Sequence, residues 1–189
     1  MWDTNLFLWL NFDGGALMDW LMLFASGKLS WIPLYILILF LIGKKFQSWR
    51  SPILALSTIG AAVGIADLIA GIFKKTGPLK HLWSDFPARL RPMYTPELEG
   101  LVHFIHGGGL YGTVSAHAAT ATAIALFATL AVKVRWFRIV MWLQCAMVCY
   151  SRIYLGYHFP QDILIGFCVG LLSGGAMWLL FSKLNDKLR

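Results

Sequence analysis

Five polar side chains in this 189-residue chain are of the types that carry out phosphate chemistry. They are two arginines, two histidines and one aspartate, and the last three follow the spacing Arg-x5-His-x3-Asp: Arg91, His117, Arg152, His158 and Asp162. An arginine presents paired N–H groups that match two phosphate oxygens, and a histidine can attack phosphorus or transfer a proton. A carboxylate four residues after a histidine can accept a hydrogen bond from its Nδ1–H and leave Nε2 free. These residues predict an anion site with a histidine nucleophile.

Two expected helix starts lie beside these side chains. Ser115 directly precedes an expected helix over 116–132 and is a favoured N-cap residue. Pro160 suits the first turn of an expected helix over 161–182, which places His158 just before that helix. A helix N-terminus offers free backbone N–H groups and the positive end of its dipole to an anion. The sequence therefore predicts two helix N-termini that face the same anion.

The segments that hold these residues resemble the motifs of the type 2 phosphatidic acid phosphatase (PAP2) family, in its bacterial membrane-bound branch. These lipid-phosphate phosphatases share a core with vanadium haloperoxidases. The family motifs are a Lys with Arg-Pro seven residues on, then Pro-Ser-Gly-His, then Ser-Arg-x5-His-x3-Asp. Here the segments read ARLRP at 88–92, VSAH at 114–117 and SR-x5-H-x3-D at 151–162. The third matches at every fixed position, and the resemblance covers residues 67–170.

Two departures from the family pattern concern the first and second motifs. The second motif keeps Ser115 and His117 but replaces Pro and Gly by Val and Ala. In the first motif, Ser84 stands where the family Lys is expected. Lys75 takes the family role if the following loop carries an insertion, and Lys74 and Lys80 are the alternatives.

The resemblance implies a role for each matched residue. His158 would attack phosphorus and form a phosphohistidine, with Asp162 orienting its ring. His117 would protonate the leaving oxygen and later take a proton from water. The residues implied to bind the substrate phosphate are Lys75, Arg91, Ser115 and Arg152. We expect no metal and no cofactor, because the arginines can neutralise the phosphate charge.

The composition predicts a small integral membrane protein. Hydrophobic residues make up 58% of the chain and charged residues 13%, with a formal net charge of +7. A soluble domain carries about 25% charged residues, so this chain has too few to coat a soluble surface. The basic residues are scattered in small groups between long apolar runs. This pattern excludes a disordered chain, a secreted disulfide scaffold and a soluble nucleic-acid binder.

The apolar runs predict an all-α polytopic helical membrane bundle that forms a single domain over residues 1–189, with the motif-bearing core at 67–170. A span needs roughly 20 apolar residues, and the runs 52–73, 112–132 and 163–182 are long enough. The runs 31–43 and 136–150 are shorter and cross only if they are extended or tilted. Residues 1–27 predict N-terminal helices at the membrane interface, with 15–27 as either an interfacial helix or a short sixth span.

The basic residues also predict the orientation. Nine of the 16 Lys and Arg residues fall in the loop at 44–50, the loop at 133–138 and the C-terminal segment at 183–189. The five expected spans bring these three segments to one face, which the positive-inside rule makes cytoplasmic. All three motifs then lie on the other face. In a bacterial inner membrane that face is periplasmic.

The leading functional hypothesis is a metal-independent membrane phosphatase that hydrolyses a lipid phosphate or diphosphate. The candidate substrates are phosphatidylglycerophosphate, phosphatidic acid, undecaprenyl diphosphate and the phosphates of lipid A. Two alternatives remain at this point. One is a phosphotransferase that passes the phosphoryl group to a lipid or alcohol, and the other is a non-catalytic lipid-binding or flipping protein. The sequence does not indicate an oligomeric state, and no nucleic-acid partner is expected.

Overall fold

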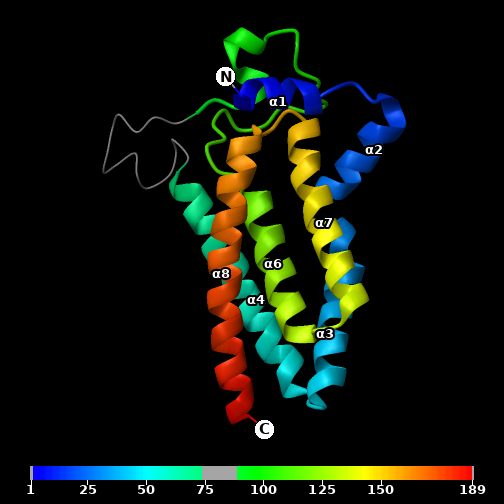
Figure 1. Ribbon diagram of the computed structural model, residues 1–189, viewed down its shortest axis with the longest axis vertical. Helices are drawn as coiled ribbons and strands as arrows, with labels where there is room; N and C mark the ends of the chain where they lie inside the picture. The colour runs from blue at the N-terminus through cyan, green and yellow to red at the C-terminus, as the bar shows by residue number, and fades with distance from the viewer. Residues whose placement is uncertain (1, 74–88, 189) are drawn as a thin grey trace.

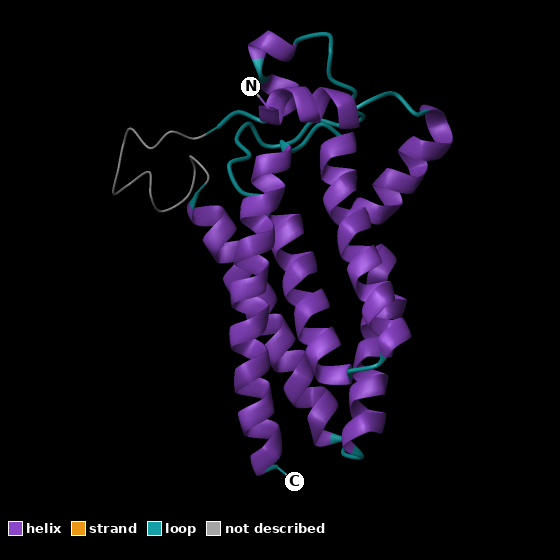
Figure 2. Ribbon diagram, viewed as in Figure 1, coloured by secondary structure: helices purple, strands orange, loops and turns teal. Residues whose placement is uncertain are grey.

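The computed structural model describes residues 2–73 and 89–188, and within these ranges the regular structure is helical (Figures 1 and 2). A single-residue bridge pairs Leu90 with Tyr111. The all-α class is therefore confirmed. The helices are α1 (Trp2–Leu10), α2 (Gly15–Ser26), α3 (Ile32–Phe46), α4 (Arg50–Ile72), α6 (Ala116–Val132), α7 (Arg135–Tyr154) and α8 (Pro160–Lys187), with the 3-10 turns η1 (Leu29–Trp31), η2 (Pro92–Tyr94) and η3 (Pro96–Leu98).

The long helices run side by side as a bundle (Figure 1). Within the described residues, three segments are long and apolar enough to cross a membrane: Leu29–Phe46, Arg50–Ile72 and Pro160–Lys187. Helix α6 has 17 residues, most of them buried, and it packs against α3, α4, α7 and α8. The chain is thus an integral membrane protein with α6 at the centre of its bundle.

One helix boundary near the site matches the sequence prediction and one differs from it. Helix α6 begins at Ala116 after its N-cap Ser115, as predicted, although the apolar run itself begins at Gly112. The run expected to end at Tyr150 continues to Tyr154. Arg152 therefore lies in the last turn of a helix and not on a loop, where a rigid backbone holds its side chain.

The N-terminal helices lie in two different places. Helix α1 lies across one end of the bundle, where it contacts α7 and α8 (Figure 1). Helix α2 packs along α7, and the chain then continues through Gly27 and Lys28 into η1 and α3. Together α2 and α3 follow one another down the bundle. Residues 15–26 are thus helical and apolar, but shorter than the three candidate spans, and their placement at the interface or within the membrane stays a prediction.

Helices α6 and α8 pack closely through three glycines spaced four residues apart on α8. A Cβ atom at Gly166, Gly170 or Gly174 would lie 2.5, 2.4 or 2.6 Å from a backbone oxygen of α6. Contact at this distance requires glycine, and small residues at every fourth position are a common device for close helix packing in membranes. The close approach brings the N-terminal ends of α6 and α8 together.

We expect Gly170→Ala to lower the stability of the bundle by about 1–3 kcal/mol, because the added methyl group must displace a rigid backbone. The matched control is Gly60→Ala on α4, where a Cβ atom meets nothing within 4 Å. Thermal unfolding of both variants in detergent measures the difference. Equal midpoints for the two variants would contradict the close-packing interpretation.

Asn11 fastens the N-terminal segment to the end of α7. Its Nδ2 donates hydrogen bonds to the carbonyl oxygens of Ile153 and Tyr154, at 3.0 and 2.7 Å, and to that of His103 at 2.9 Å. Its Oδ1 accepts a hydrogen bond from the backbone N–H of His103 at 2.8 Å. Four hydrogen bonds to one buried side chain hold α1, the 101–106 loop and α7 in a fixed arrangement.

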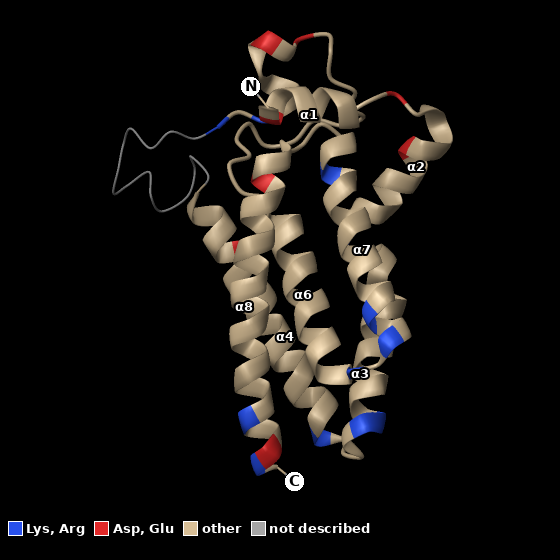
Figure 3. Cartoon of the chain, in the orientation of Figure 1, with Lys and Arg blue, Asp and Glu red and all other residues tan. Residues whose placement is uncertain are grey.

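The basic residues gather at the end of the bundle opposite to α1 (Figure 3). The last turn of α3 carries Lys44 and Lys45, and Lys133 ends α6. Acidic residues prevail at the other end, where α1 begins with Asp3 and η3 contains Glu97. The three basic segments thus share one end of the bundle, as the sequence predicts.

Candidate active site

A cavity of about 700 Å³ joins the predicted motif residues to the apolar interior of the bundle. Its walls come from the α2–α3 segment, α4, α6 and α7. The polar lining includes Arg91, His117, Arg152 and His158. The rest of the lining is mostly apolar, with Ile38, Leu56, Ile59, Val63, Ile124 and Val148, and it also contains Lys28, Asp67 and Gln144. Segments far apart in the sequence therefore build one space with a basic part and an apolar part.

The turn after α7 explains the five-residue spacing between Arg152 and His158. Gly156 adopts φ +71°, a left-handed conformation that glycine tolerates, and this reverses the chain at the helix end. The backbone N–H groups of Tyr157 and His158 then donate to the Arg152 carbonyl oxygen, at 3.0 and 3.1 Å. This tight turn places His158 beside Arg152.

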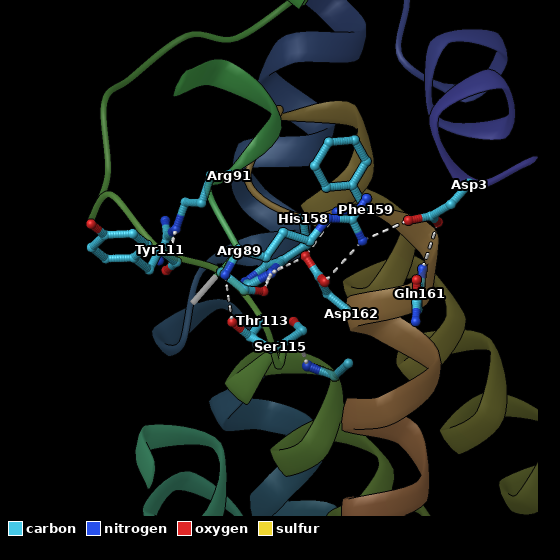
Figure 4. A network of polar contacts seen from close by, with 12 residues as sticks. Asp3, Arg89, Arg91, Tyr111, Thr113, Ser115, His158, Phe159, Gln161 and Asp162 are labelled. Carbon is cyan, nitrogen blue, oxygen red and sulfur yellow. Dashed lines mark hydrogen bonds and ion pairs between the residues drawn. The ribbon is translucent and has the colours of Figure 1, made fainter. Parts of the chain in front are cut away.

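The start of α8 explains the three-residue spacing between His158 and Asp162. The Asp162 Oδ2 atom accepts a hydrogen bond from the backbone N–H of Phe159, the N-cap, at 3.1 Å. His158 Nδ1 lies 3.3 Å from the same oxygen and 2.9 Å from the carbonyl oxygen of Gly112 (Figure 4). Because a carbonyl oxygen can only accept, Nδ1 carries the proton. In the neutral ring Nε2 then keeps a lone pair, which a nucleophile requires.

The second motif forms the beginning of α6. Ser115 caps the helix as predicted, since its Oγ accepts a hydrogen bond from the backbone N–H of Ala118 at 3.3 Å. The Ser115 backbone N–H donates to the carbonyl oxygen of Asp162 at 3.1 Å, which joins the first turns of α6 and α8. His117 lies in the first turn of α6, half-buried, and lines the cavity.

The two predicted arginines lie on the same aromatic ring. Arg152 lies 4.1 Å and Arg91 5.4 Å from the ring centroid of Tyr157. Arg152 is 7% exposed and donates to Ser26 Oγ, and Arg91 Nε donates to the Tyr111 carbonyl oxygen at 3.2 Å. Burial lowers the pKa of the Arg91 guanidinium from its ordinary value. Since arginine stays charged in proteins, both guanidinium groups face the cavity as cations, and Lys28 also lines it.

The structure brings most of the predicted site residues together. Arg91, His117, Arg152 and His158 line the cavity, while Ser115 and Asp162 are buried behind its wall. Lys75, Lys74 and Lys80, the candidates for the family lysine, lie outside the described residues.

Sequence reasoning missed several residues that contact the site. Gly112 accepts a hydrogen bond from His158, and Tyr157 carries both arginines on its ring. Arg89 forms ion pairs with the two buried carboxylates of Asp3 and Asp162. Tyr157 falls within the variable part of the third motif, and Asp3 comes from a helix that matches no motif. No local spacing in the sequence points to either one.

One further group has metal-ligand side chains, although it is separate from the cavity lining. Within the described residues, ligand atoms of Asp13, Asp19 and His103 lie within 4.8 Å of one another. Asp19 Oδ1 also accepts a hydrogen bond from the Tyr154 hydroxyl at 2.7 Å and lies 2.9 Å from His103 Nε2. These contacts give the cluster a structural role, because they tie α2 and the 101–106 loop to α7.

Comparison with known proteins identifies the family. The model of the PAP2 superfamily matches residues 54–186, which is well over half of the chain. The chain belongs to the PAP2 superfamily. With its apolar bundle, it is an integral membrane phosphatase of this superfamily. The family resemblance and the function class predicted from the sequence are confirmed.

Two curated relatives and one solved structure resemble this PAP2 protein over most of its length. A lipid A 4'-phosphatase of Bacteroides thetaiotaomicron is 31% identical, covering 99% of this chain and 80% of the relative. A lipid A 4'-phosphatase of Porphyromonas gingivalis is 30% identical, covering 95% and 72%. The crystal structure of LpxE from Aquifex aeolicus has a TM-score of 0.65 at 22% identity, covering 92% of this chain and 93% of that one. That structure shows the shared fold.

Proposed function

We propose that this PAP2 phosphatase hydrolyses a phosphate monoester of a lipid A-type glycolipid through a phosphohistidine formed on His158. The observation that carries the proposal is the cavity itself, in which the cations and histidines continue directly into an apolar space. A phosphate on a lipid has this same combination of a dianionic group and a hydrocarbon tail. The two relatives named lipid A 4'-phosphatase support lipid A over the other candidate lipids.

In the proposed first step, His158 Nε2 attacks phosphorus in line with the leaving oxygen. The Nδ1–H bonds to Gly112 and Asp162 hold the ring and stabilise the positive charge that it acquires. His117 protonates the leaving sugar oxygen, which would otherwise depart as an unstable alkoxide. The P–O bond breaks as the N–P bond forms, and the dephosphorylated lipid leaves.

In the proposed second step, water attacks the phosphohistidine. His117, now neutral, takes a proton from this water, and His158 departs with the electron pair of the N–P bond. Inorganic phosphate is the second product. His117 thus acts as the acid in the first step and as the base in the second.

The proposed phosphate site uses cations and helix N-termini. Arg91 and Arg152 neutralise the non-bridging oxygens, and the first turn of α6, capped by Ser115, offers its positive dipole end. Lys75 stays our prediction for a further cation that binds the phosphate. Because these groups already supply the positive charge that phosphoryl transfer needs, the proposed reaction needs no metal or other cofactor.

We also propose that the site faces the periplasm of a bacterial inner membrane. The basic ends of α3 and α8 lie at the end of the bundle opposite to α1 (Figure 3). The positive-inside rule makes that end cytoplasmic. Substrate would then reach the cavity from the outer leaflet.

Phosphate release from defined lipids tests the proposal. The purified protein is assayed with lipid A, phosphatidylglycerophosphate, phosphatidic acid and undecaprenyl diphosphate, each with and without EDTA. We expect the highest kcat/KM for lipid A, activity that persists in EDTA, and competitive inhibition by vanadate, whose five-coordinate form mimics the transition state.

Three results would contradict parts of this proposal. If one of the other lipids gives a higher kcat/KM, that lipid and not lipid A is the preferred substrate. Transfer of labelled phosphate to a lipid or alcohol, without free phosphate, would identify a phosphotransferase. Binding of every lipid without turnover would identify a lipid-binding or flipping protein.

A further inference from the structure

Next to His158, the charged side chains of Asp3, Arg89 and Asp162 form a line. The proposed mechanism gives a role only to Asp162. The Arg89 Nη1 atom lies 2.6 Å from Asp3 Oδ2 and 3.5 Å from Asp162 Oδ1 (Figure 4). The Arg89 guanidinium also stacks on the ring of Phe159, with its Cζ 3.6 Å from the ring centroid. The two carboxylate side chains are 6% and 2% exposed. Both carboxylates are therefore largely shielded from water, whereas the Arg89 side chain between them is 30% exposed.

Arg89 also holds the second partner of His158 through its main chain. The backbone N–H of Gly112 donates to the Arg89 carbonyl oxygen at 2.9 Å. The Arg89 backbone N–H in turn donates to Thr113 Oγ1 at 3.1 Å. The two acceptors next to His158 Nδ1 are the Gly112 carbonyl and the Asp162 carboxylate, so a single residue fixes both of them.

Asp3 fixes the far end of the line. Its Oδ1 accepts a hydrogen bond from the backbone N–H of Gln161 at 2.9 Å, in the first turn of α8. Its Oδ2 faces Arg89. Asp3 thus joins α1 to the same helix start that carries Asp162. Without the guanidinium between them, the two carboxylates would repel each other in a region that excludes most water.

We propose that Arg89 and Asp3 are positioning residues for the nucleophile, an inference that rests on the function proposed above. Arg89 engages Asp162 Oδ1, and this directs Oδ2 toward Phe159 N–H and His158 Nδ1. The pair of carboxylates and the guanidinium carry a net charge of −1, which offsets the positive charge on the histidine ring in the phosphohistidine. Helix α1 is then part of the catalytic unit through Asp3.

Arg89 differs in its surroundings from the arginines of the cavity. Arg91 and Arg152 line the cavity, where a phosphate would bind, whereas Arg89 does not belong to that lining. Its guanidinium is instead occupied by Asp3, Asp162 and the Phe159 ring. We therefore expect Arg89 to influence the rate of the chemical step and not the binding of substrate.

Steady-state kinetics on the full-length protein, with lipid A or the best lipid of the substrate screen, test this. We expect Arg89→Met to lower kcat by about 100-fold, the size of a small misplacement of a reacting group, while KM stays within about threefold. Arg89→Lys keeps the positive charge, and we expect its kcat to be about 10-fold higher than that of Arg89→Met. Arg138→Met, an exposed arginine at the other end of the bundle, is the matched control and should leave both constants unchanged.

A double-mutant cycle tests the link to α1. Asp3→Asn keeps an oxygen for the Gln161 N–H but removes the charge that faces Arg89, and we expect kcat to fall by about 10-fold. In an Arg89→Met background the same change should have little further effect, because the partner is already gone. Asp186→Asn, an exposed aspartate near the C-terminus, is the matched control.

The outcomes separate this inference from the proposed function. A rise in KM with unchanged kcat in Arg89→Met would make Arg89 a phosphate-binding residue and overturn the inference. Equal losses in Arg89→Met and Arg89→Lys with a matching fall in thermal stability would show a structural role only. If Arg89→Met does not fold, the Arg89→Lys and Asp3→Asn results decide by the same criteria. No turnover of any lipid by the unmodified protein, or full turnover by His158→Ala, would instead refute the proposed function.

Discussion

Replacing His158 by glutamine is expected to abolish turnover, with a loss in kcat of at least about 10⁴-fold. Glutamine has no ring nitrogen that can form an N–P bond, so the covalent route is closed. The nearby cations remain and should still bind the substrate, so KM should change little. Phosphate release from lipid A measures the loss, and mass spectrometry after an alkaline quench tests for phosphohistidine at residue 158.

His106→Gln is the matched control for this substitution. His106 is exposed on the loop before α6 and does not line the cavity. This variant should keep the activity and the phosphohistidine of the unmodified protein. Turnover by His158→Gln at the level of this control would show that the reaction takes place elsewhere in the molecule.

Replacing Arg152 by methionine is expected to lower kcat/KM by about 10³-fold. Arg152 is 7% exposed, and its Nε has no hydrogen-bond partner among the described residues. A buried donor that lines an anion cavity is available to a phosphate oxygen. Because the phosphate gains negative charge density at its oxygens during transfer, this donor should contribute most in the transition state. Steady-state kinetics measure the loss.

Two companion variants sharpen the test of Arg152. Arg152→Lys keeps the charge but loses the planar fork and the stacking on Tyr157. We expect this variant to stay at least about 10-fold below the unmodified protein. Arg135→Met, at the exposed start of α7, controls for removal of a cation. If Arg152→Met loses stability but keeps kcat/KM within a few-fold of normal, the arginine serves the fold and not the phosphate.

The effects expected at Arg152 and at Arg89 distinguish a residue that binds phosphate from a residue that positions the nucleophile. Loss of Arg152 should weaken vanadate binding and lower kcat, because its guanidinium faces the cavity. Loss of Arg89 should lower kcat at nearly constant KM, because its contacts are to Asp3 and Asp162. The charge is the same at both positions, and only the surroundings differ.

Local sequence spacing predicted that the residues of the third motif lie close together in the structure. Arg152, His158 and Asp162 are close in sequence, and a helix end, a tight turn and a helix start bring them together. The geometry depends on backbone hydrogen bonds within a dozen residues, which leave few alternatives once Gly156 and Pro160 are in place. Ser115 as a helix cap followed from the same kind of local reasoning.

Helix boundaries were less predictable, because apolar composition does not reveal where a helix must end. Residues 112–115 are as free of charge as the helix that follows them, yet they are not helical. Their backbone groups bond to Arg89, His158 and Asp162 instead of to a helical turn. The run 15–27 is apolar and short, and only the tertiary structure shows that its helix packs on α7.

The sequence by itself determined the membrane class, the family and the residues of the reactive cluster that lie in motifs. It could do so because composition and short-range spacing carry that information directly. The tertiary structure decided which groups surround the nucleophile. Asp3, Arg89 and Gly112 come from three separate segments. Gly112 contacts His158, Arg89 contacts Asp162, and Asp3 contacts Arg89, only after α1, α6 and α8 have packed. Contacts of this kind depend on the close approach of α6 and α8 at Gly166 and Gly170, which no single motif records.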